Sequence, residues 1–428
     1  MPLIARGGGA SSVESVLRSM VLPRAFTAPG PADSGASSMI EFQPPQASQR
    51  PLHLRWRAPQ AVQVNWGDAL AMRVYRARNG AAQGWAGGFR SPFARRCGTR
   101  VLARTEDMMA DHLRWGILGA AKIARTDLMP AIHMAQGAEL VALATRDPAR
   151  AAPFRAVVPG LRVHDSYQAL LDDPAIDAVY IPLPNDLHVE WSLKALAAGK
   201  HVLCEKPMAL RAEDFDALIA ARDASGLMCA EGFMVCHHPQ WHRARALLAE
   251  GAIGELVHVD AAFTFYNADP ANIRNRPETG GGAMYDIGVY PCITTRFATG
   301  AEPRRLRADL RREGGVDVFG RVWAEFETFT MGFYVGMRAA PRQGIAFHGT
   351  EGVMELPFPF NAGKAGAAQV IVKRGNDHTV IERFEPVDQY RLMIEAFGRS
   401  VRDGAPFACP LEFSRGNQAM VDAILAAG

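Results

Sequence analysis

Short apolar runs and stretches of helical character alternate from Leu113 onwards, and this alternation restricts the fold more than any other feature of the sequence. Strands that are separated in this way by helices form parallel sheets covered on both faces. The expected strands are residues 114–118, 139–145, 176–182, 201–205 and 227–234. The expected helices are residues 122–135, 188–199 and 213–226. Ligands of such sheets bind at the carboxyl ends of the strands, so we expect a site there.

Strand-like stretches with short turns dominate the chain after Phe233. They are residues 254–266, 302–313, 315–328, 329–338, 352–358, 367–374 and 378–385. Such a run predicts an antiparallel or mixed sheet. The sequence therefore predicts a first, α/β domain over residues 109–232 and a second, α+β domain over residues 233–428.

Residues 1–108 form a leader of different composition. The first 107 residues contain 14 arginines, no lysine and six acidic residues, a net charge of +8; because the whole chain carries +3, the remainder carries −5. The leader is rich in Gly, Ala, Ser and Pro and has no strand or helix period, so we expect it to be disordered or weakly ordered. It could serve as an organelle transit peptide or a non-specific phosphate binder. We prefer a start at Met108 or Met109, which would leave the leader without a role.

Composition excludes several classes of protein. The six cysteines form no C-x-x-C pair, so we expect neither a metal site nor a disulfide framework. No apolar run approaches the roughly 18–20 residues that cross a membrane, and the amino terminus lacks the apolar run of a secretory signal. The acidic body argues against a nucleic-acid partner. We expect a soluble, cytoplasmic protein.

The segment GILGAAKIA, residues 116–124, follows the first strand and opens the first helix, which Pro130 interrupts. It fits the G-x-G-x-x-A pattern of dinucleotide-binding turns, with an alanine in place of the second glycine. The helix amino end could hold a pyrophosphate, although a plain strand-turn-helix would look the same. The candidate contacts are Gly119, Ala121, Lys122 and Ile123.

The end of the second strand bears on the type of dinucleotide. An acidic residue there would accept hydrogen bonds from an adenine ribose and favour NAD. Thr145 and Arg146 occupy the position instead, and a hydroxyl and a cation suit a 2′-phosphate. Asp147 follows directly, and Arg146 could be an ordinary surface residue. We predict NADP, with NAD as the less favoured cofactor.

Polar residues also follow the strands that end near residues 182 and 204. After Pro182, Asn185 could cap the next helix and lie with His188 near the cofactor, although such a histidine is often a core residue. In HVLCEKPM an apolar strand runs directly into Glu205 and Lys206, where a chain built only to pack would place turn residues. Without further information, an exposed ion pair explains Glu205 and Lys206 equally well.

Together, GILGAAKIA, ATRD, PNDLH, HVLCEKPM and GGGAMYDIGVY resemble the Gfo/Idh/MocA family of nicotinamide-dependent oxidoreductases, over the chain from about Leu113. The resemblance implies a Rossmann NAD(P)-binding domain followed by an α+β domain with a large, open-faced, mostly antiparallel sheet. It implies that Lys206 lies beside the nicotinamide and the reacting hydroxyl, and that the bond to Pro207 is cis. It also implies a homo-oligomer, most simply a homodimer, formed through the open sheet face.

Asp286 and Tyr290, in GGGAMYDIGVYPC, are four residues apart and would share one face of a helical turn. Pro291 should confine that turn to a helix start, because a proline deeper in a helix breaks the hydrogen-bond ladder. A tyrosine at position 290, where many members have histidine, resembles the branch with glucose-fructose oxidoreductase, dimeric dihydrodiol dehydrogenase and NADP-linked xylose dehydrogenases. Arg276 could hold the substrate or only its own loop.

Oxidation of a secondary alcohol needs a base for the hydroxyl proton. Tyr290 is the candidate, and the ammonium of Lys206 and the cationic nicotinamide should both lower its pKa from about 10. Asp286 should orient the pair. We therefore predict a hydride transfer between NADP and a sugar, polyol or cyclic diol, with Lys206, Asp286 and Tyr290 as catalytic residues. The alternative is a sensor that binds NAD(P) without catalysis, which we would expect to have lost the lysine or the tyrosine.

Overall fold

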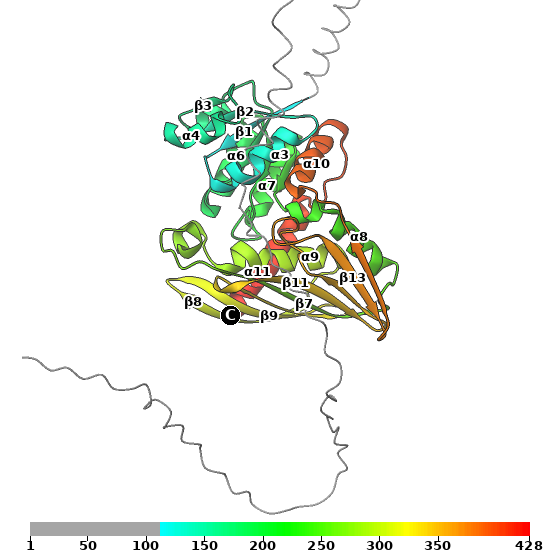
Figure 1. Cartoon of the computed structure of the whole chain (residues 1–428). Helices are drawn as coiled ribbons and strands as arrows, with labels where there is room; N and C mark the ends of the chain where they lie inside the picture. The colour runs from blue at the N-terminus through cyan, green and yellow to red at the C-terminus, as the bar shows by residue number, and fades with distance from the viewer. Residues whose placement is uncertain (1–111) are drawn as a thin grey trace, which may run out of the picture. The chain divides into compact units, whose positions relative to one another are not determined.

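The computed structural model describes residues 112–428, so the predictions for the leader lie outside the described residues. Within this range, none of the helices has both the length and the apolar character that crossing a membrane requires. The described part contains one parallel and one mixed sheet (Figure 1). The expected α/β and α+β architecture is confirmed.

The first sheet has six parallel strands in the order β3-β2-β1-β4-β5-β6. They are β1 (Leu113–Leu118), β2 (Ala138–Ala144), β3 (Arg162–His164), β4 (Ala178–Ile181), β5 (His201–Cys204) and β6 (Cys229–Glu231). The connecting helices are η1 (Ala124–Leu128), α3 (Met129–Met134), α4 (Pro148–Arg155), α5 (Tyr167–Leu171), η2 (Asn185–Leu187), α6 (His188–Ala197) and α7 (Asp214–Ser225). All four residues of β4 are buried, as expected for a strand covered on both faces.

The sequence interpretation missed β3 with its neighbouring helices α4 and α5. β3 is three residues long and no residue in it is fully buried, so it has no apolar run that could reveal it. α4 begins where the Asp147 side chain accepts a hydrogen bond from the backbone N–H of Ala149, with Pro148 in the first turn. Both are ordinary signals of a helix start. The capping signal was present in the sequence, and was interpreted only as part of a turn.

The second sheet has eight strands in the order β14-β13-β12-β11-β7-β10-β9-β8, and only the β7–β10 pair is parallel. The strands are β7 (Leu256–Tyr266), β8 (Arg305–Glu313), β9 (Val316–Glu325), β10 (Thr330–Gly336), β11 (Arg338–Gly349), β12 (Val353–Leu356), β13 (Gln369–Arg374) and β14 (His378–Arg383). The interpretation missed β11, a central strand. Its register shifts between Arg338 and Arg342, around Pro341, and this irregular, polar beginning hides it in the sequence.

Helices cover one face of this sheet, and in Figure 1 the opposite face carries no helix of the described chain. The elements of this half are η3 (Met234–His237), α8 (Pro239–Ala249), η4 (Ile273–Asn275), η5 (Pro277–Thr279), η6 (Met284–Gly288), α9 (Val289–Thr299), α10 (Gln389–Asp403) and α11 (Leu411–Ala427). α10 packs on α3 and β2 of the first half, and α11 packs on α7 and β6. Residue 233 divides the sequence into an α/β part and an α+β part, but the hydrophobic core continues across that division.

Candidate active site

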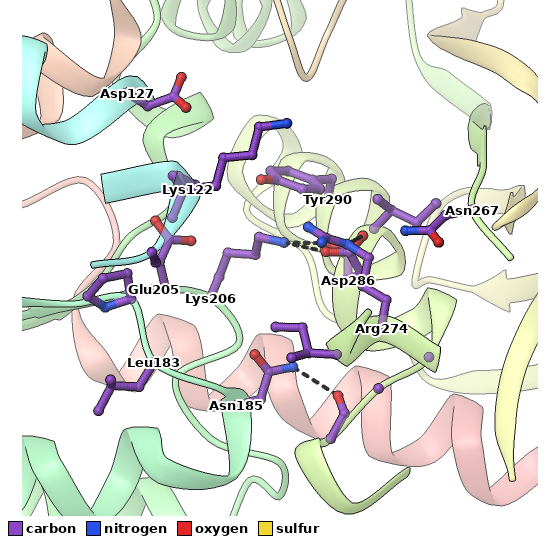
Figure 2. Close-up of a pocket in the computed structure, with 18 of the residues that line it drawn as sticks. Lys122, Asp127, Leu183, Asn185, Glu205, Lys206, Asn267, Arg274, Asp286 and Tyr290 are labelled. Atoms are coloured by element: carbon purple, nitrogen blue, oxygen red, sulfur yellow. Dashed lines mark hydrogen bonds and ion pairs between the residues drawn. The ribbon is translucent and has the colours of Figure 1, made fainter. Parts of the chain in front are cut away.

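A cavity of about 600 Å³ lies at the carboxyl ends of β1, β4 and β5, where η6, α9 and β7 face them (Figure 2). Most of the predicted site residues line it: Ala121, Lys122, Ile123, Pro182, Asn185, His188, Glu205, Lys206, Asp286 and Tyr290. The predicted residues that do not line it are Gly119, Thr145, Arg146 and Arg276. The second half adds lining residues that the sequence interpretation did not single out, among them Phe263, Phe265, Asn267, Arg274, Asn361 and Tyr390.

Gly119 forms the turn between β1 and the first helix. Its φ of 104° is a conformation that glycine adopts at little cost, and a Cβ there would approach Leu183 Cδ2 to 3.0 Å. The turn places Ala121, Lys122 and Ile123 on the cavity wall, and the Lys122 side chain extends into the cavity in Figure 2. Backbone N–H groups at a helix amino end, together with a lysine, suit a pyrophosphate.

Thr145 and Arg146 lie beyond the end of β2, outside this cavity. Thr145 is buried and its hydroxyl hydrogen-bonds to the backbone of Asp147, whereas Arg146 is exposed. The Asp147 carboxylate accepts the Ala149 N–H at 2.9 Å. The acid that could compete for an adenine ribose is therefore engaged as a helix cap.

The side chains of Asn185 and His188 hydrogen-bond to neighbouring segments, and neither caps the start of a helix. The prediction that Asn185 caps α6 is wrong: Leu187 precedes the helix without a side-chain cap, and the Asn185 amide donates to the carbonyl of Gly280 at 2.9 Å. His188 is fully buried, with its ring nitrogens 2.7 Å and 2.8 Å from the carbonyls of Pro207 and Leu183. Burial lowers the His188 pKa, although both carbonyls favour the protonated ring. The histidine thus ties the segment after Lys206 to the end of β4.

The Glu-Lys-Pro segment follows β5 and turns into the cavity. The expected cis bond between Lys206 and Pro207 is present. Glu205 is buried, and its Oε1 accepts a hydrogen bond from the Tyr180 hydroxyl at 2.5 Å. Burial raises the pKa of Glu205, although the Lys206 charge and the Tyr180 hydroxyl oppose the rise. Lys206 is therefore not bound to its sequence neighbour, and the simple ion pair that the sequence left open is not formed.

The partner of Lys206 is Asp286. The lysine Nζ donates to the Asp286 backbone carbonyl at 2.6 Å and lies 3.3 Å from its carboxylate Oδ1. Arg274 donates from Nε to the other carboxylate oxygen at 2.6 Å. Burial alone would raise the pKa of Asp286, but the two cations outweigh it and lower that pKa. The three side chains form one ion network at the cavity wall (Figure 2).

Arg274 was missed by the sequence interpretation, which singled out Arg276 two positions later. Arg276 pairs with Glu278 at 2.8 Å and does not line the cavity. Both arginines occur in the short segment NIRNRP, and the 3-10 turn η4 directs only the first toward Asp286. No local pattern distinguishes the two, because the partner lies on the next helix, η6, and the turn between them decides which arginine reaches it.

Tyr290 lies beside Lys206 but is not activated by it in this structure. The lysine Nζ is 5.1 Å from the centre of the tyrosine ring, and the hydroxyl is 3.7 Å from the sulfur of Met234. The ring packs among Phe263 and Phe360, each 5.7 Å away. Burial raises the pKa of Tyr290 well above its usual value. Within the described chain, burial therefore outweighs the lowering of the pKa expected from Lys206, and the Asp286 carboxylate contacts Lys206 and Arg274 rather than the Tyr290 hydroxyl.

The helix that carries Asp286 and Tyr290 begins with a π turn. η6 runs into α9 without a break, so Pro291 lies inside the helix rather than at its start, which corrects the prediction. In a π turn the carbonyl of residue i pairs with the N–H of residue i+5. For Asp286 that residue is Pro291, which has no N–H. Pro291 therefore does not donate to the Asp286 carbonyl, which accepts from Lys206.

Comparison with known proteins identifies the family. Residues 113–233 match the model described as an oxidoreductase family with an NAD-binding Rossmann fold, and residues 241–355 match the GFO/IDH/MocA C-terminal domain. An uncharacterized oxidoreductase of Rhizobium meliloti is 40% identical over 326 residues, 73% of this chain and 96% of that protein. The chain belongs to the Gfo/Idh/MocA oxidoreductase family.

Named Gfo/Idh/MocA relatives are similar along the same part of the chain. D-xylose 1-dehydrogenase (NADP(+)) 2 of Haloferax volcanii is 33% identical over 73% of this chain and 96% of its own length. The crystal structure of a 3-ketoreductase from Actinomadura kijaniata, in complex with NADP and TDP-benzene, matches with a TM-score of 0.69 and 33% identity, over 74% of this chain and 98% of that one. The Actinomadura structure therefore shares the fold of this chain over almost all of its own length.

Proposed function

We propose that this protein transfers a hydride between NADP and a hydroxyl- or keto-bearing carbon of a sugar, polyol or cyclic diol, with Lys206 and Tyr290 handling the proton. The observation that carries this proposal is the position of Lys206, held at 2.6 Å by the Asp286 carbonyl and lying 5.1 Å from the Tyr290 ring. An amine and a phenol from distant parts of the chain thus meet at the carboxyl edge of a dinucleotide-binding sheet.

NADP fits the residues at the cavity and at the neighbouring strand end. The Gly119 turn, the helix amino end and Lys122 suit the pyrophosphate. Thr145 and Arg146 lie where a 2′-phosphate would be recognised, and Asp147 is occupied by its own helix. The Haloferax relative is named for NADP and the Actinomadura structure contains it, which supports the same choice. When bound, the cofactor supplies or accepts the hydride.

Burial raises the pKa of Tyr290, so its phenol is protonated and can act as a proton donor in the reducing direction. A protonated phenol can donate its proton to the oxygen of a carbonyl group while that carbon receives the hydride, and solvent then returns a proton to the phenolate. Lys206 has three N–H bonds, and its two contacts with Asp286 leave one for the same oxygen. In the oxidising direction the same groups would run in reverse, with Tyr290 as the base.

The substrate end of the cavity suits a hydroxylated ring. Amide groups of Asn267 and Asn361 and the guanidinium of Arg274 lie there beside the aromatic rings of Phe263 and Phe265. Amides and a guanidinium can hydrogen-bond hydroxyl groups, and aromatic faces can pack on the apolar face of a sugar ring. The named relatives act on a sugar or a ketone, as their names state.

The test is turnover with a panel of sugars, diols and their keto forms, followed by nicotinamide absorbance with NADPH, NADP, NADH or NAD. Lys206→Ala and Tyr290→Phe should each lower kcat by about 100-fold, the order of a lost proton donor, and leave the Kd of NADPH within about threefold. Unchanged turnover in both variants would remove the proposed mechanism. NADPH binding without turnover of any compound would favour the sensor.

We also propose a homodimer that covers the open face of the second sheet. Trp323 is 37% exposed and Ile381 41% exposed on strands of this sheet. Exposed apolar groups on a large sheet favour association. Sedimentation at several protein concentrations checks this, and a monomer at every concentration would contradict it.

A further inference from the structure

Two buried carboxylates outside the ion network hold the two segments that carry it. Glu231, the last residue of β6, accepts the backbone N–H of Met208 at 2.8 Å, two residues after Lys206. Asp317 in β9 accepts the backbone N–H of Met284 at 2.8 Å, two residues before Asp286. The two contacts lie on opposite sides of the Lys206–Asp286 hydrogen bond.

These contacts satisfy N–H groups that have no other described partner. Met208 lies in the irregular segment after β5, and Met284 lies at the amino end of its helix, where the first N–H groups lack partners within the helix. Both residues are fully buried, and a buried N–H without an acceptor is costly. Each carboxylate therefore supplies the one acceptor described for its N–H group.

The anchoring is not a by-product of packing. Glu231 and Asp317 are only 3% and 4% exposed, and burying a carboxylate is unfavourable compared with burying an apolar side chain of similar size. Burial raises the pKa of Glu231 to about 7 and that of Asp317 to about 6, despite the N–H bonds that each accepts.

The Asp317 contact is also a close one. A Cβ at Gly282 would collide with the Asp317 carboxylate, so this side chain packs directly on the glycine turn that precedes Asp286. Displacing it would let that turn shift. Such a shift would disturb the Lys206–Asp286 contact, because its 2.6 Å hydrogen bond joins a side chain of one segment to the backbone of the other.

We propose that Glu231 and Asp317 are positioning residues that together set the separation between the Lys206 segment and the Asp286 segment. They touch neither the cavity nor the reacting atoms; they act through Met208 and Met284. The expected effect on turnover rests on the proposed function, whereas the effect on geometry does not. A misplacement of about 1 Å can lower a rate about 100-fold, so the two anchors should matter for kcat.

Two kinds of variant of the full chain test this. Glu231→Met and Asp317→Leu remove the acceptor while keeping a side chain of similar size, and should lower kcat by about tenfold or more with the Kd of NADPH within about threefold. Glu231→Gln and Asp317→Asn keep an acceptor oxygen and should hold kcat within about threefold of the wild type. In a Lys206→Ala background, Glu231→Met should cost no further activity, because it acts through the lysine.

Asp177→Leu is the matched control. Asp177 also accepts a distant backbone N–H, that of Arg114 at 2.9 Å, but at the amino end of β1, away from the cavity. This variant should lower Tm and leave kcat unchanged. A purely structural role for Glu231 and Asp317 would give the same result as this control.

A wild-type kcat in Glu231→Met and Asp317→Leu overturns the proposal. It is also overturned if Glu231→Gln and Asp317→Asn lose as much kcat as these apolar variants. If the apolar variants do not fold, the Gln and Asn variants decide: kcat within threefold supports the proposal, and a tenfold loss overturns it.

Crystal structures of the variants give a readout that needs no turnover. The Lys206 Nζ to Asp286 carbonyl contact should open beyond hydrogen-bonding distance in the apolar variants, and an unchanged contact overturns the proposal even if no substrate is found.

Discussion

Lys206 is held by one carboxylate and by one backbone carbonyl, and the carbonyl gives the shorter contact, 2.6 Å against 3.3 Å. A carbonyl cannot be protonated, so this contact persists when the charge of Asp286 changes. Pro291, five residues later, has no N–H that could compete for this carbonyl. A proline that would be expected to break a helix is thus compatible with the placement of the Lys206 amine.

Pro291→Ala should weaken this arrangement. The alanine N–H can turn toward the Asp286 carbonyl and compete with Lys206, so we expect kcat to fall about fivefold to tenfold, the cost of one displaced hydrogen bond of about 1 kcal/mol. Steady-state kinetics measures the fall. Pro148→Ala is the control, because Pro148 occupies the first turn of α4, where an N–H has no helical partner. An unchanged kcat in Pro291→Ala would show that the proline has no part in holding Lys206.

At the scale of elements, both helices that frame the cavity contain a π turn followed closely by a proline. η1 ends at Leu128 before Pro130, and η6 ends at Gly288 before Pro291. A π turn inserts one residue and re-aims the side chains beside it. Asp127 and Asp286, one from each π turn, line the cavity. The sequence shows the prolines, but it does not show that the helix continues through them.

The Gly119 turn, which precedes η1, allows a prediction about stability and cofactor binding. Gly119→Ala places a side chain at a φ of 104° and 3.0 Å from Leu183, so we expect about 1–3 kcal/mol of lost stability and a weaker Kd for NADPH. Gly226→Ala also places a side chain at a positive φ, 67° in the milder left-handed helical region, and has open space around it. It should lower stability without changing the Kd. Fluorescence titration with NADPH and thermal unfolding separate the two effects, and equal Kd values for both variants would contradict a cofactor role for the Gly119 turn.

At the scale of the whole molecule, the two halves share one hydrophobic core. Trp115 of β1 packs against Phe397 of α10, with ring centres 5.1 Å apart, although they are far apart in the sequence. A shared core of this kind couples the unfolding of both halves.

Phe397→Ala should therefore lower the stability of both halves together. We expect a loss of about 3–5 kcal/mol and a single thermal transition at lower temperature. Differential scanning calorimetry checks this, with Phe397→Leu as the milder control. Two separate transitions in the wild type would show that the halves unfold independently.

Stability should also depend on pH through Glu231. Its pKa of about 7 in the folded protein exceeds the 4.5 of a free glutamate, so its contribution is fully present below pH 4.5 and is lost as the pH rises through 7. The hydroxyl of Ser414, the charge of Lys206 and the Met208 N–H lower this pKa, and Glu205 raises it, but burial dominates. Glu231→Gln should flatten the pH dependence of the unfolding free energy over this range by up to about 3 kcal/mol. Denaturant unfolding at several pH values measures it, and identical profiles would refute the assignment.

The sequence by itself determined most strands of both sheets, the Gly119 turn, and the segments that carry Lys206, Asp286 and Tyr290, but not β3, α4, α5 or β11. These features depend on local periodicity and on turn chemistry, which neighbouring residues set. Pairing Lys206 with Asp286 required the resemblance to a family, because 80 residues separate them in the chain.

Only the tertiary structure decided which arginine reaches Asp286, what surrounds the Tyr290 hydroxyl, and which backbone N–H groups Glu231 and Asp317 accept. Each of these depends on contacts between different elements of the fold. Burial raised the pKa of Tyr290 in the described chain, whereas the sequence had indicated a lowering by Lys206 and the nicotinamide. Local sequence fixes which groups are available, whereas desolvation and long-range packing fix their charge and their partners.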